Sequence, residues 1–446
     1  MKILTDLHGC DKNLVDAEEM LPRLLLAGHT LTDDPDEADV ILVHTCCFIR
    51  PAKEESIGAI LSACDKKKEG RVKAVIVTGC MAKRYESEIR SSIPEADAVV
   101  PLADAEAVVR YLDALENGGK EEAPAEEGGV PKALPRIPQR VITTGGLYEY
   151  LRIADGCDKH CTYCVIPKIR GPYRSVPMEK LLDQAEELAS QGVRELILVA
   201  QETTRYGVDL YGEKKLHVLL KALCRIEGFA WIRILYCYPE EIYPELIETM
   251  AAEPKICHYL DLPVQHCDDQ ILRKMARRTT GDEIRAIVST LRERIPDIAL
   301  RTTLIAGFPG ETEEQHRSLV SFVREMRFAR LGAFAYSKEE DTAAARMPGQ
   351  VHYRTKERRQ RELMEAQAEA CRAFAQQKIG TLTEVLIEGR LPEEDVYVGR
   401  TYADAPEIDG YVFVTSQREL MTGDLVRVRV TGASDYDLEG VLEDGE

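Results

Sequence analysis

Short apolar runs alternate with amphipathic stretches along most of the chain. Within the first 115 residues, strand-like runs at 2–7, 38–43 and 72–77 are separated by helical patterns such as 13–28. Strands that alternate with helices indicate βαβ units and a parallel sheet. Six further βα repeats predict a partial or complete TIM-like (β/α) barrel. Their strands are expected at 149–154, 195–200, 231–236, 258–264, 299–306 and 331–336.

The pattern changes at two places. Residues 116–140 are rich in Gly, Pro, Ala and charge, which is typical of a flexible linker. From residue 380 onward, short alternating segments separated by Gly, Pro and Asp predict a small antiparallel β-barrel. We therefore expect an α/β multidomain protein. Its parts would be a parallel α/β domain at 1–115, the linker at 116–140, the larger barrel at 141–379 and the small barrel at 380–446.

Composition and charge narrow the range of partners. The 446 residues are 44% hydrophobic and carry a net charge of −19, which excludes a disordered chain. From residue 380 to the end there are 16 acidic and 5 basic residues. Affinity for phosphate backbones comes mainly from Lys and Arg, so we expect a neutral or basic partner and no RNA binding by this tail. Apolar runs well short of 20 residues and the lack of a leader at MKILTDLHGC predict a cytoplasmic protein outside membranes.

The sharpest chemical signal is a CxxxCxxC motif made by Cys157, Cys161 and Cys164, directly after the first strand of the larger barrel. Three thiolates at this spacing can ligate three irons of a four-iron cluster and leave the fourth open to an exogenous ligand. The loop also follows the end of a strand, where βα barrels place their active sites. The alternative is a structural zinc site, which needs a fourth protein ligand. His160 lies between two of the cysteines, where simultaneous ligation is awkward.

A second set of cysteines follows the three N-terminal strand patterns. KILTDLHGC ends at Cys10, ADVILVHTC at Cys46 and VKAVIVTGC at Cys80, with separations of 36 and 34 residues. Each separation is close to the length of a βαβ unit. Parallel strands end at one edge of the sheet, so the three thiols are predicted to converge on a second cluster site. The alternative is three buried loop cysteines that serve packing. The other seven cysteines show no comparable spacing.

These motifs resemble a known family. The CxxxCxxC motif with an aromatic residue, Tyr163, before its last cysteine resembles that of the radical S-adenosylmethionine enzymes. The segments GCDKNLVDAE, HTC and TGCMAKRY, together with RIADGCDKHCTYCVIPKIRGPYRS, are similar to the methylthiotransferase branch of that superfamily. The resemblance covers the whole chain, with an N-terminal cluster domain, a radical barrel and a C-terminal domain similar to the TRAM module.

The resemblance implies an enzyme with two [4Fe-4S] clusters and S-adenosylmethionine. The cluster at Cys157, Cys161 and Cys164 would bind S-adenosylmethionine and split it to a radical that abstracts hydrogen from carbon. The cofactor supplies that difficult step, while the protein positions the carbon. The second cluster would hold the sulfur that is methylated and delivered, at Cys10, Cys46 and Cys80. A reducing electron donor and a sulfur source are further implied partners.

Other strand ends are candidates for the S-adenosylmethionine pocket. Gly307, Gly310 and Glu311 end one barrel strand, and glycines there permit the close backbone approach that a nucleoside requires. The alternative for this segment is an ordinary glycine turn. Gln201 and Gln265 lie at further strand ends and are candidates to line the pocket with Tyr163, although polar residues at such positions often only bond to a loop.

The resemblance leaves two main substrates, an adenosine in transfer RNA and an aspartate of protein twelve of the small ribosomal subunit. The acidic tail favours the ribosomal protein as substrate, because a basic protein is its electrostatic complement. The reaction would then take place at the β-carbon of the aspartate. The segments 200–213, 259–278, 334–344 and 398–410 also resemble the ribosomal-protein branch. A non-enzymatic acidic scaffold that binds ribosomal protein and stores metal is the remaining alternative. His8, Cys47 and Glu202 depart from the usual family residues.

Overall fold

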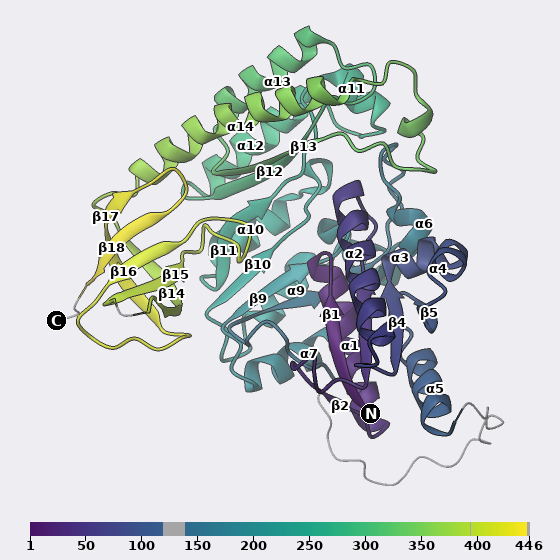
Figure 1. Cartoon of the computed structure of the whole chain (residues 1–446). Coiled ribbons are helices and arrows are strands. Elements are labelled where there is room, and N and C mark those ends of the chain that lie inside the picture. The colour runs from purple at the N-terminus through teal and green to yellow at the C-terminus, as the bar shows by residue number, and fades with distance from the viewer. Residues whose placement is uncertain (119–138, 393, 444–446) are drawn as a thin grey trace. The chain divides into compact units, whose positions relative to one another are not determined.

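The computed structural model describes residues 1–118, 139–392 and 394–443 (Figure 1). It divides the chain into two compact units, Met1–Thr143 and Thr144–Glu446. Residues 119–138 of the predicted linker at 116–140 lie outside the described residues. The second unit contains both predicted barrels. No helix among the described residues is long and apolar enough to cross a membrane.

The first unit is built on a five-stranded, fully parallel sheet in the order β2-β1-β3-β4-β5. The strands are β1 (Lys2–Leu7), β2 (Thr30–Leu31), β3 (Val40–Thr45), β4 (Ala74–Gly79) and β5 (Ala98–Pro101). Every residue of β3 and β4 is buried, as expected for parallel strands covered on both faces. The sequence pattern predicted β1, β3 and β4, and the short β2 and β5 complete the sheet.

Helices connect these strands and cover the sheet. They are α1 (Asp11–Leu26), α2 (Arg50–Lys68), α3 (Cys80–Arg84), α4 (Glu86–Ser92) and α5 (Ala105–Glu116). Leu21 and Leu24 of α1 and Val108 and Leu112 of α5 pack in one apolar cluster with Ile3 of β1. This packing joins two helices to one face of the sheet.

The second unit begins with a six-stranded parallel sheet in the order β13-β12-β11-β10-β9-β6, which confirms the predicted βα alternation. The strands are β6 (Tyr148–Arg152), β9 (Glu195–Val199), β10 (Trp231–Ile234), β11 (Ile256–Asp261), β12 (Ala299–Ala306) and β13 (Arg330–Ala335). Spatial order follows chain order, as in a barrel. Among the described strands, β6 and β13 do not pair with each other, so the barrel is partial.

Helices and two short strands complete this part. The short strands are β7 (Ala154–Asp155) and β8 (Arg174–Ser175), which pair antiparallel on either side of the cysteine loop. The helices are α6 (Ile166–Arg170), α7 (Met178–Ser190), α8 (Val208–Tyr211), α9 (Leu216–Leu223), α10 (Pro244–Ala252), α11 (Asp269–Lys274), α12 (Gly281–Arg294), α13 (Glu313–Met326) and α14 (Tyr353–Gln376). Helices α12 and α13 each begin with a complete capping box, at Thr280 and Thr312.

The chain ends in a closed five-stranded barrel in the order β14-β15-β16-β18-β17. Its strands are β14 (Leu382–Arg390), β15 (Val396–Arg400), β16 (Val412–Thr415), β17 (Leu425–Ala433) and β18 (Leu438–Leu442). Four of the five pairings are antiparallel, as the sequence predicted, and the pairing of β16 with β18 is parallel.

One loop of the small barrel packs against the larger one. The segment 400–409, from the end of β15 into the loop before β16, contacts a residue of every strand of the six-stranded sheet. These residues are Tyr148, Glu195, Arg233, Tyr259, Arg301 and Arg330. The two barrels of the second unit are therefore joined by polar contacts that reach all six strands.

The centre of this contact is a buried ion triad. The Glu195 carboxylate accepts from Arg233 at 2.6 Å and from Arg400 at 2.7 Å, and all three side chains are fully buried. Burial alone would raise the pKa of the Glu195 carboxyl, but the two guanidinium groups lower it. Buried charges of this kind persist only when they are paired.

Candidate active site

Chemically competent side chains gather at the carboxyl ends of strands in the second unit. The cysteine loop follows β6 and β7, Gln201 follows β9, and Tyr238 follows β10. Gln265 follows β11 and Gly307 follows β12. Since the strands are parallel, their carboxyl ends lie at one edge, which is where barrels of this type bind substrate.

The three cysteines of the CxxxCxxC motif lie within electrostatic range of one another. Cys157 interacts with Cys161, and Cys164 interacts with both. The sulfur of Cys157 accepts the backbone N–H of Lys159 at 3.4 Å, and that of Cys164 accepts the N–H of Ile166 at 3.4 Å. Backbone donors aimed at two sulfurs fit thiolates in this loop.

Burial disfavours the thiolate form of two of these cysteines. Burial raises the pKa of Cys157 to about 11 and that of Cys164 to about 12. Such sites become thiolates when a bound cation compensates the negative charge. Three soft sulfur ligands match the requirement of an iron–sulfur cluster with one open iron. The residues present therefore fit the group that the motif predicts.

The rest of the unit holds the cysteine loop in place. The Thr162 N–H donates to the carbonyl of Met275 at 3.1 Å, and its hydroxyl donates to the carbonyl of Lys274 at 2.7 Å. Gly156 has φ +75°, and a Cβ there would lie 2.1 Å from the Pro172 carbonyl oxygen. Only glycine permits this close crossing of two backbone segments.

The glycine segment after β12 lies next to the cysteine loop. The ring of Tyr163 meets that of Phe308 edge to face, with centroids 6.5 Å apart. Phe308 in turn packs on Tyr336 at 5.4 Å. The structure thus brings Tyr163, Gly307 and the cysteines to one place, as the sequence predicted, while their contact with a cofactor stays a prediction.

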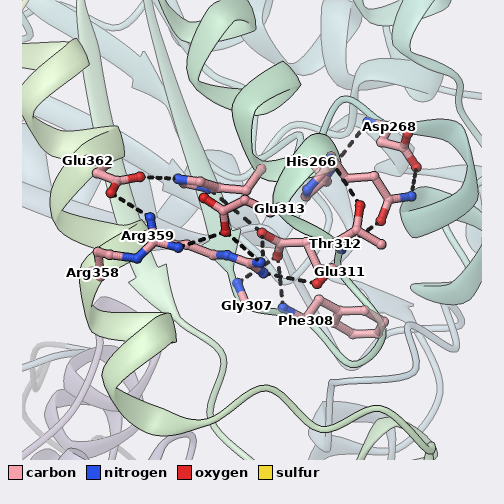
Figure 2. Close-up of polar contacts among 12 residues, drawn as sticks. His266, Asp268, Gly307, Phe308, Glu311, Thr312, Glu313, Arg358, Arg359 and Glu362 are labelled. Carbon is pink, nitrogen blue, oxygen red and sulfur yellow. Dashed lines mark hydrogen bonds and ion pairs between the residues drawn. The ribbon is translucent and has the colours of Figure 1, made fainter.

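Glu311 is engaged by the protein itself (Figure 2). Its Oε2 accepts the backbone N–H groups of Gly307 at 2.6 Å and Phe308 at 3.0 Å, and its Oε1 accepts from Arg359 of α14 at 3.1 Å. The side chain is fully buried. Its contacts indicate that Glu311 shapes the turn around Gly307 and Gly310, and its predicted contact with the cofactor is untested.

The polar residues at two other strand ends also form hydrogen bonds to other residues of the protein. The Gln201 amide donates to Asp155 at 3.2 Å, and Gln265 has φ +69° while its backbone pairs with Thr303 and Ile305 of β12. Beside Gln201, burial raises the pKa of the Glu202 carboxyl to about 7. A carboxyl of this kind next to the cysteine loop is a feature of a functional site.

A cluster of charged and aromatic side chains surrounds Cys161, and the sequence pattern did not predict it. Tyr238, Arg277 and Lys159 lie together there, with Glu240 and Glu241 paired to Lys159 at 3.2 and 2.7 Å. Lys159 lies inside the motif, but Tyr238 and Arg277 are distant in sequence. Since their only sequence signal is a position after a strand or a helix, only the fold identifies them.

The N-terminal cysteines follow the ends of three adjacent parallel strands in the first unit. Cys10 precedes α1, Cys46 follows β3 and Cys80 begins α3. Cys10 is exposed, whereas Cys46 and Cys80 are each 7% exposed. Burial raises the pKa of Cys46, and the neighbouring Cys10 raises it further. The predicted placement at one sheet edge is therefore what the structure has.

The side chain of Asn13 connects these strand ends by hydrogen bonds. Its amide N–H₂ donates to the carbonyls of His8 at 3.1 Å and Thr45 at 2.9 Å, and its amide oxygen accepts from the Cys80 thiol at 3.1 Å. A Cβ on Gly9 would lie 2.8 Å from the Cys46 Cβ, so glycine is required beside the cysteines. Cys47 is fully buried, and burial raises its pKa to about 11.

Neither cysteine set is a single-ion site. No group of three or more His, Cys, Asp or Glu side chains within residues 1–118, 139–392 and 394–443 is arranged around one metal ion. A four-iron cluster makes a different demand, because each thiolate binds a different iron. The cluster assignment of the two sets stays a prediction.

Three family models match successive parts of the chain. Residues 2–101 match the uncharacterized protein family UPF0004, residues 151–323 the radical SAM superfamily and residues 379–442 the TRAM domain. A solved structure of the radical S-adenosylmethionine methyltransferase TsrM from Kitasatospora setae, with cobalamin and a [4Fe-4S] cluster, gives a TM-score of 0.54. It is 15% identical and covers 75% of this chain and 74% of that one, a likeness of fold alone.

The partial barrel, the cysteine loop and the matching family model together define a radical S-adenosylmethionine enzyme. Enzymes of this class use a [4Fe-4S] cluster and S-adenosylmethionine. The ribosomal protein uS12 methylthiotransferase RimO of Lachnoclostridium phytofermentans is 54% identical over 443 residues, 99% of this chain and 100% of that protein. The RimO of Geobacter sulfurreducens is 46% identical over 97% of each chain. The chain belongs to this methylthiotransferase family.

Proposed function

We propose that this enzyme places a methylthio group on the β-carbon of an aspartate in ribosomal protein uS12. The observation that carries the proposal is the 54% identity, over the full length of both chains, to a relative named for methylthiolation of uS12. Methylthiolation of a transfer-RNA adenosine would instead require a tail that tolerates phosphate, and this tail is acidic. A cytoplasmic location follows from a ribosomal substrate.

Cys157, Cys161 and Cys164 would hold the radical cluster, and Cys10, Cys46 and Cys80 the sulfur-bearing one. When bound, the two clusters and S-adenosylmethionine supply hydrogen abstraction and sulfur delivery. The burial of Cys157 and Cys161 supports the first assignment, since it keeps water from a reactive site. The Asn13 contacts support the second, because they fix Cys80 relative to the neighbouring strand ends.

The S-adenosylmethionine pocket would be formed by the strand ends that carry Tyr163, Gln201, Gln265 and the segment Gly307–Gly310. Glu311 and Arg359 would hold this segment in position through their hydrogen bonds and not through contact with the cofactor. The family models support a division into domains at 1–115, 141–379 and 380–446, since their matched ranges fall inside or next to these bounds.

The acidic tail would attract the basic substrate protein. Its charge is 16 acidic against 5 basic residues. A complementary field speeds encounter and selects against wrong partners. An electron donor and a sulfur source would act as further partners of the two clusters.

Mass spectrometry of uS12 from cells that lack the gene, complemented with this chain, tests the function. The wild-type chain should restore the methylthio mass increment on the aspartate-containing peptide. An unchanged uS12 spectrum together with restoration of a methylthiolated transfer-RNA nucleoside would establish the competing reaction. A spectrum in which neither product returns would favour a scaffold without enzymatic activity.

Two cysteine variants test the division of labour. Cys157→Ala should abolish reductive cleavage of S-adenosylmethionine, since it removes a ligand of the radical cluster. Cys80→Ala should leave cleavage largely intact but stop sulfur insertion, and lower the bound iron from about eight to about four per chain. Cys64→Ala, at a buried helical thiol, is the matched control. Equal loss of cleavage in Cys157→Ala and Cys80→Ala would contradict separate roles.

A further inference from the structure

The hydroxyl of Tyr238 reaches the cysteine loop from a different strand. Tyr238 follows β10, directly before the turn Pro239–Glu241. Its hydroxyl oxygen lies 3.9 Å from the sulfur of Cys161, within hydrogen-bond range for sulfur. Once Cys161 binds iron, its sulfur carries no proton, so Tyr238 is then the donor and the sulfur the acceptor.

Two cations lie over the ring of the same tyrosine. The guanidinium carbon of Arg277 is 4.1 Å from the ring centroid, and the ammonium nitrogen of Lys159 is 4.8 Å from it. Lys159 is held by Glu240 and Glu241, and Arg277 donates to the Pro263 carbonyl at 3.0 Å. A cation over an aromatic ring draws on its electron density, which makes the phenol a stronger hydrogen-bond donor.

The position of Arg277 is energetically costly. Its side chain is 1% exposed, and within the described part of the chain its Nε and Nη1 have no hydrogen-bond partner. A carboxylate oxygen of Glu240 is 3.8 Å away. A buried guanidinium with unused donors destabilises a fold unless nearby negative charge compensates it. The ring of Tyr238 provides part of that compensation, and a cluster-bound thiolate at Cys161 would add to it.

We propose that Tyr238, polarised by Arg277 and Lys159, donates a hydrogen bond to the Cys161 sulfur and raises the reduction potential of the radical cluster. The inference rests on the proposed assignment of Cys161 as a cluster ligand. Hydrogen bonds to cysteine sulfur and local charge are among the factors that set the potential of such clusters. They favour the reduced cluster because it carries one more negative charge. Tyr238 and Arg277 are positioning residues that make reduction of the cluster easier and correspondingly lower the driving force for electron transfer from the reduced cluster.

Redox titration of a single cluster in the full chain tests this. Replacement of Cys10, Cys46 and Cys80 by Ala leaves one cluster, with about four irons per chain after anaerobic reconstitution. The reduced cluster is followed by electron paramagnetic resonance at set solution potentials. At a fixed potential, Tyr238→Phe should lower the ratio of reduced to oxidised cluster roughly three- to tenfold, the worth of one hydrogen bond. Arg277→Met should lower it in the same direction, and Arg277→Lys less.

Tyr243→Phe is the matched control. Tyr243 lies close by in sequence, and its ring also has a cation over it, Lys214 at 5.2 Å. Its hydroxyl, however, contacts His217 at 3.2 Å rather than a cluster cysteine, so its replacement should leave the potential unchanged. Equal potentials in Tyr238→Phe, Tyr243→Phe and the parent would overturn the inference. A parent that binds no iron would overturn the ligand assignment itself, which the iron content reports separately.

Discussion

Glu311 accounts for the conformation of the glycine segment after β12. Its carboxylate binds two consecutive backbone N–H groups, of Gly307 and Phe308, and one guanidinium, of Arg359. Burial raises the pKa of Glu311, while Arg359 and the two N–H groups oppose this. A buried carboxylate held from three directions is a fixed support for the segment, and the helix that carries Arg359 becomes part of the site's framework.

Glu311→Gln should therefore destabilise the second unit and weaken S-adenosylmethionine binding. The single amide oxygen can accept either from the two backbone N–H groups or from Arg359, but not from both. Arg359 then loses a buried charged partner, and we expect this loss to lower the free energy of unfolding by about 3 kcal/mol. Denaturant unfolding and equilibrium binding of S-adenosylmethionine measure the two effects. Glu313→Gln is the control, since Glu313 pairs with Arg358 and Arg359 while 46% exposed and should cost about 1 kcal/mol or less. Equal effects of the two changes would contradict the role of Glu311.

At the scale of elements, the segment 400–409 joins the small barrel to the larger one. Arg330, the first residue of β13, forms a buried ion pair with Asp404. Tyr259 of β11 donates to Asp409 at 2.7 Å, and Tyr148 of β6 donates to Glu407 at 2.8 Å. Since these contacts lie toward the amino-terminal end of the sheet, opposite the cysteines, they stabilise the barrel without occupying its active-site edge.

A double-mutant cycle on Arg330 and Asp404 measures this connection. Arg330→Met and Asp404→Leu should each cost about 3–5 kcal/mol, because each leaves one buried charge unpaired. The double variant should cost clearly less than the sum. The control is the pair of Arg372 on α14 and Asp435 in the small barrel, both about half exposed, for which no measurable coupling is expected. Additive effects at Arg330 and Asp404 would show that the segment only rests on the barrel.

The sequence predicted elements well where periodicity was long and poorly where tertiary contacts decide. The strands that end at Cys10, Cys46 and Cys80 were predictable because buried parallel strands are continuous apolar runs. The four-residue β5 and the parallel β16–β18 pairing carry no such local signal. The cysteines of the site were identifiable from spacing. Tyr238 and Arg277 were not, since their proximity to Cys161 exists only in the folded chain.

On the scale of the whole molecule, only part of the tail's negative charge is available to a partner. Four acidic side chains act inside the second unit, namely Glu388, Asp404, Glu407 and Asp409. Three others pair with arginines at the surface, namely Asp395, Asp435 and Glu443. Among the described tail residues, four exposed glutamates have neither an ion pair nor a side-chain hydrogen bond, namely Glu384, Glu394, Glu419 and Glu439. These four are the candidates for attraction of a basic protein.

Replacement of all four exposed glutamates by Gln should slow association with uS12 at low ionic strength by about threefold or more, because unpaired rim charges act mainly on the association rate. The difference should vanish near 1 M salt, where charges are screened within about 3 Å. Stopped-flow binding at several salt concentrations measures both effects. The control changes four exposed glutamates of the larger barrel to Gln, namely Glu227, Glu245, Glu248 and Glu293. Both variants have the same net charge. Only a larger effect of the tail variant therefore supports a docking role for the tail. Equal slowing in both variants would assign the attraction to the charge of the molecule as a whole.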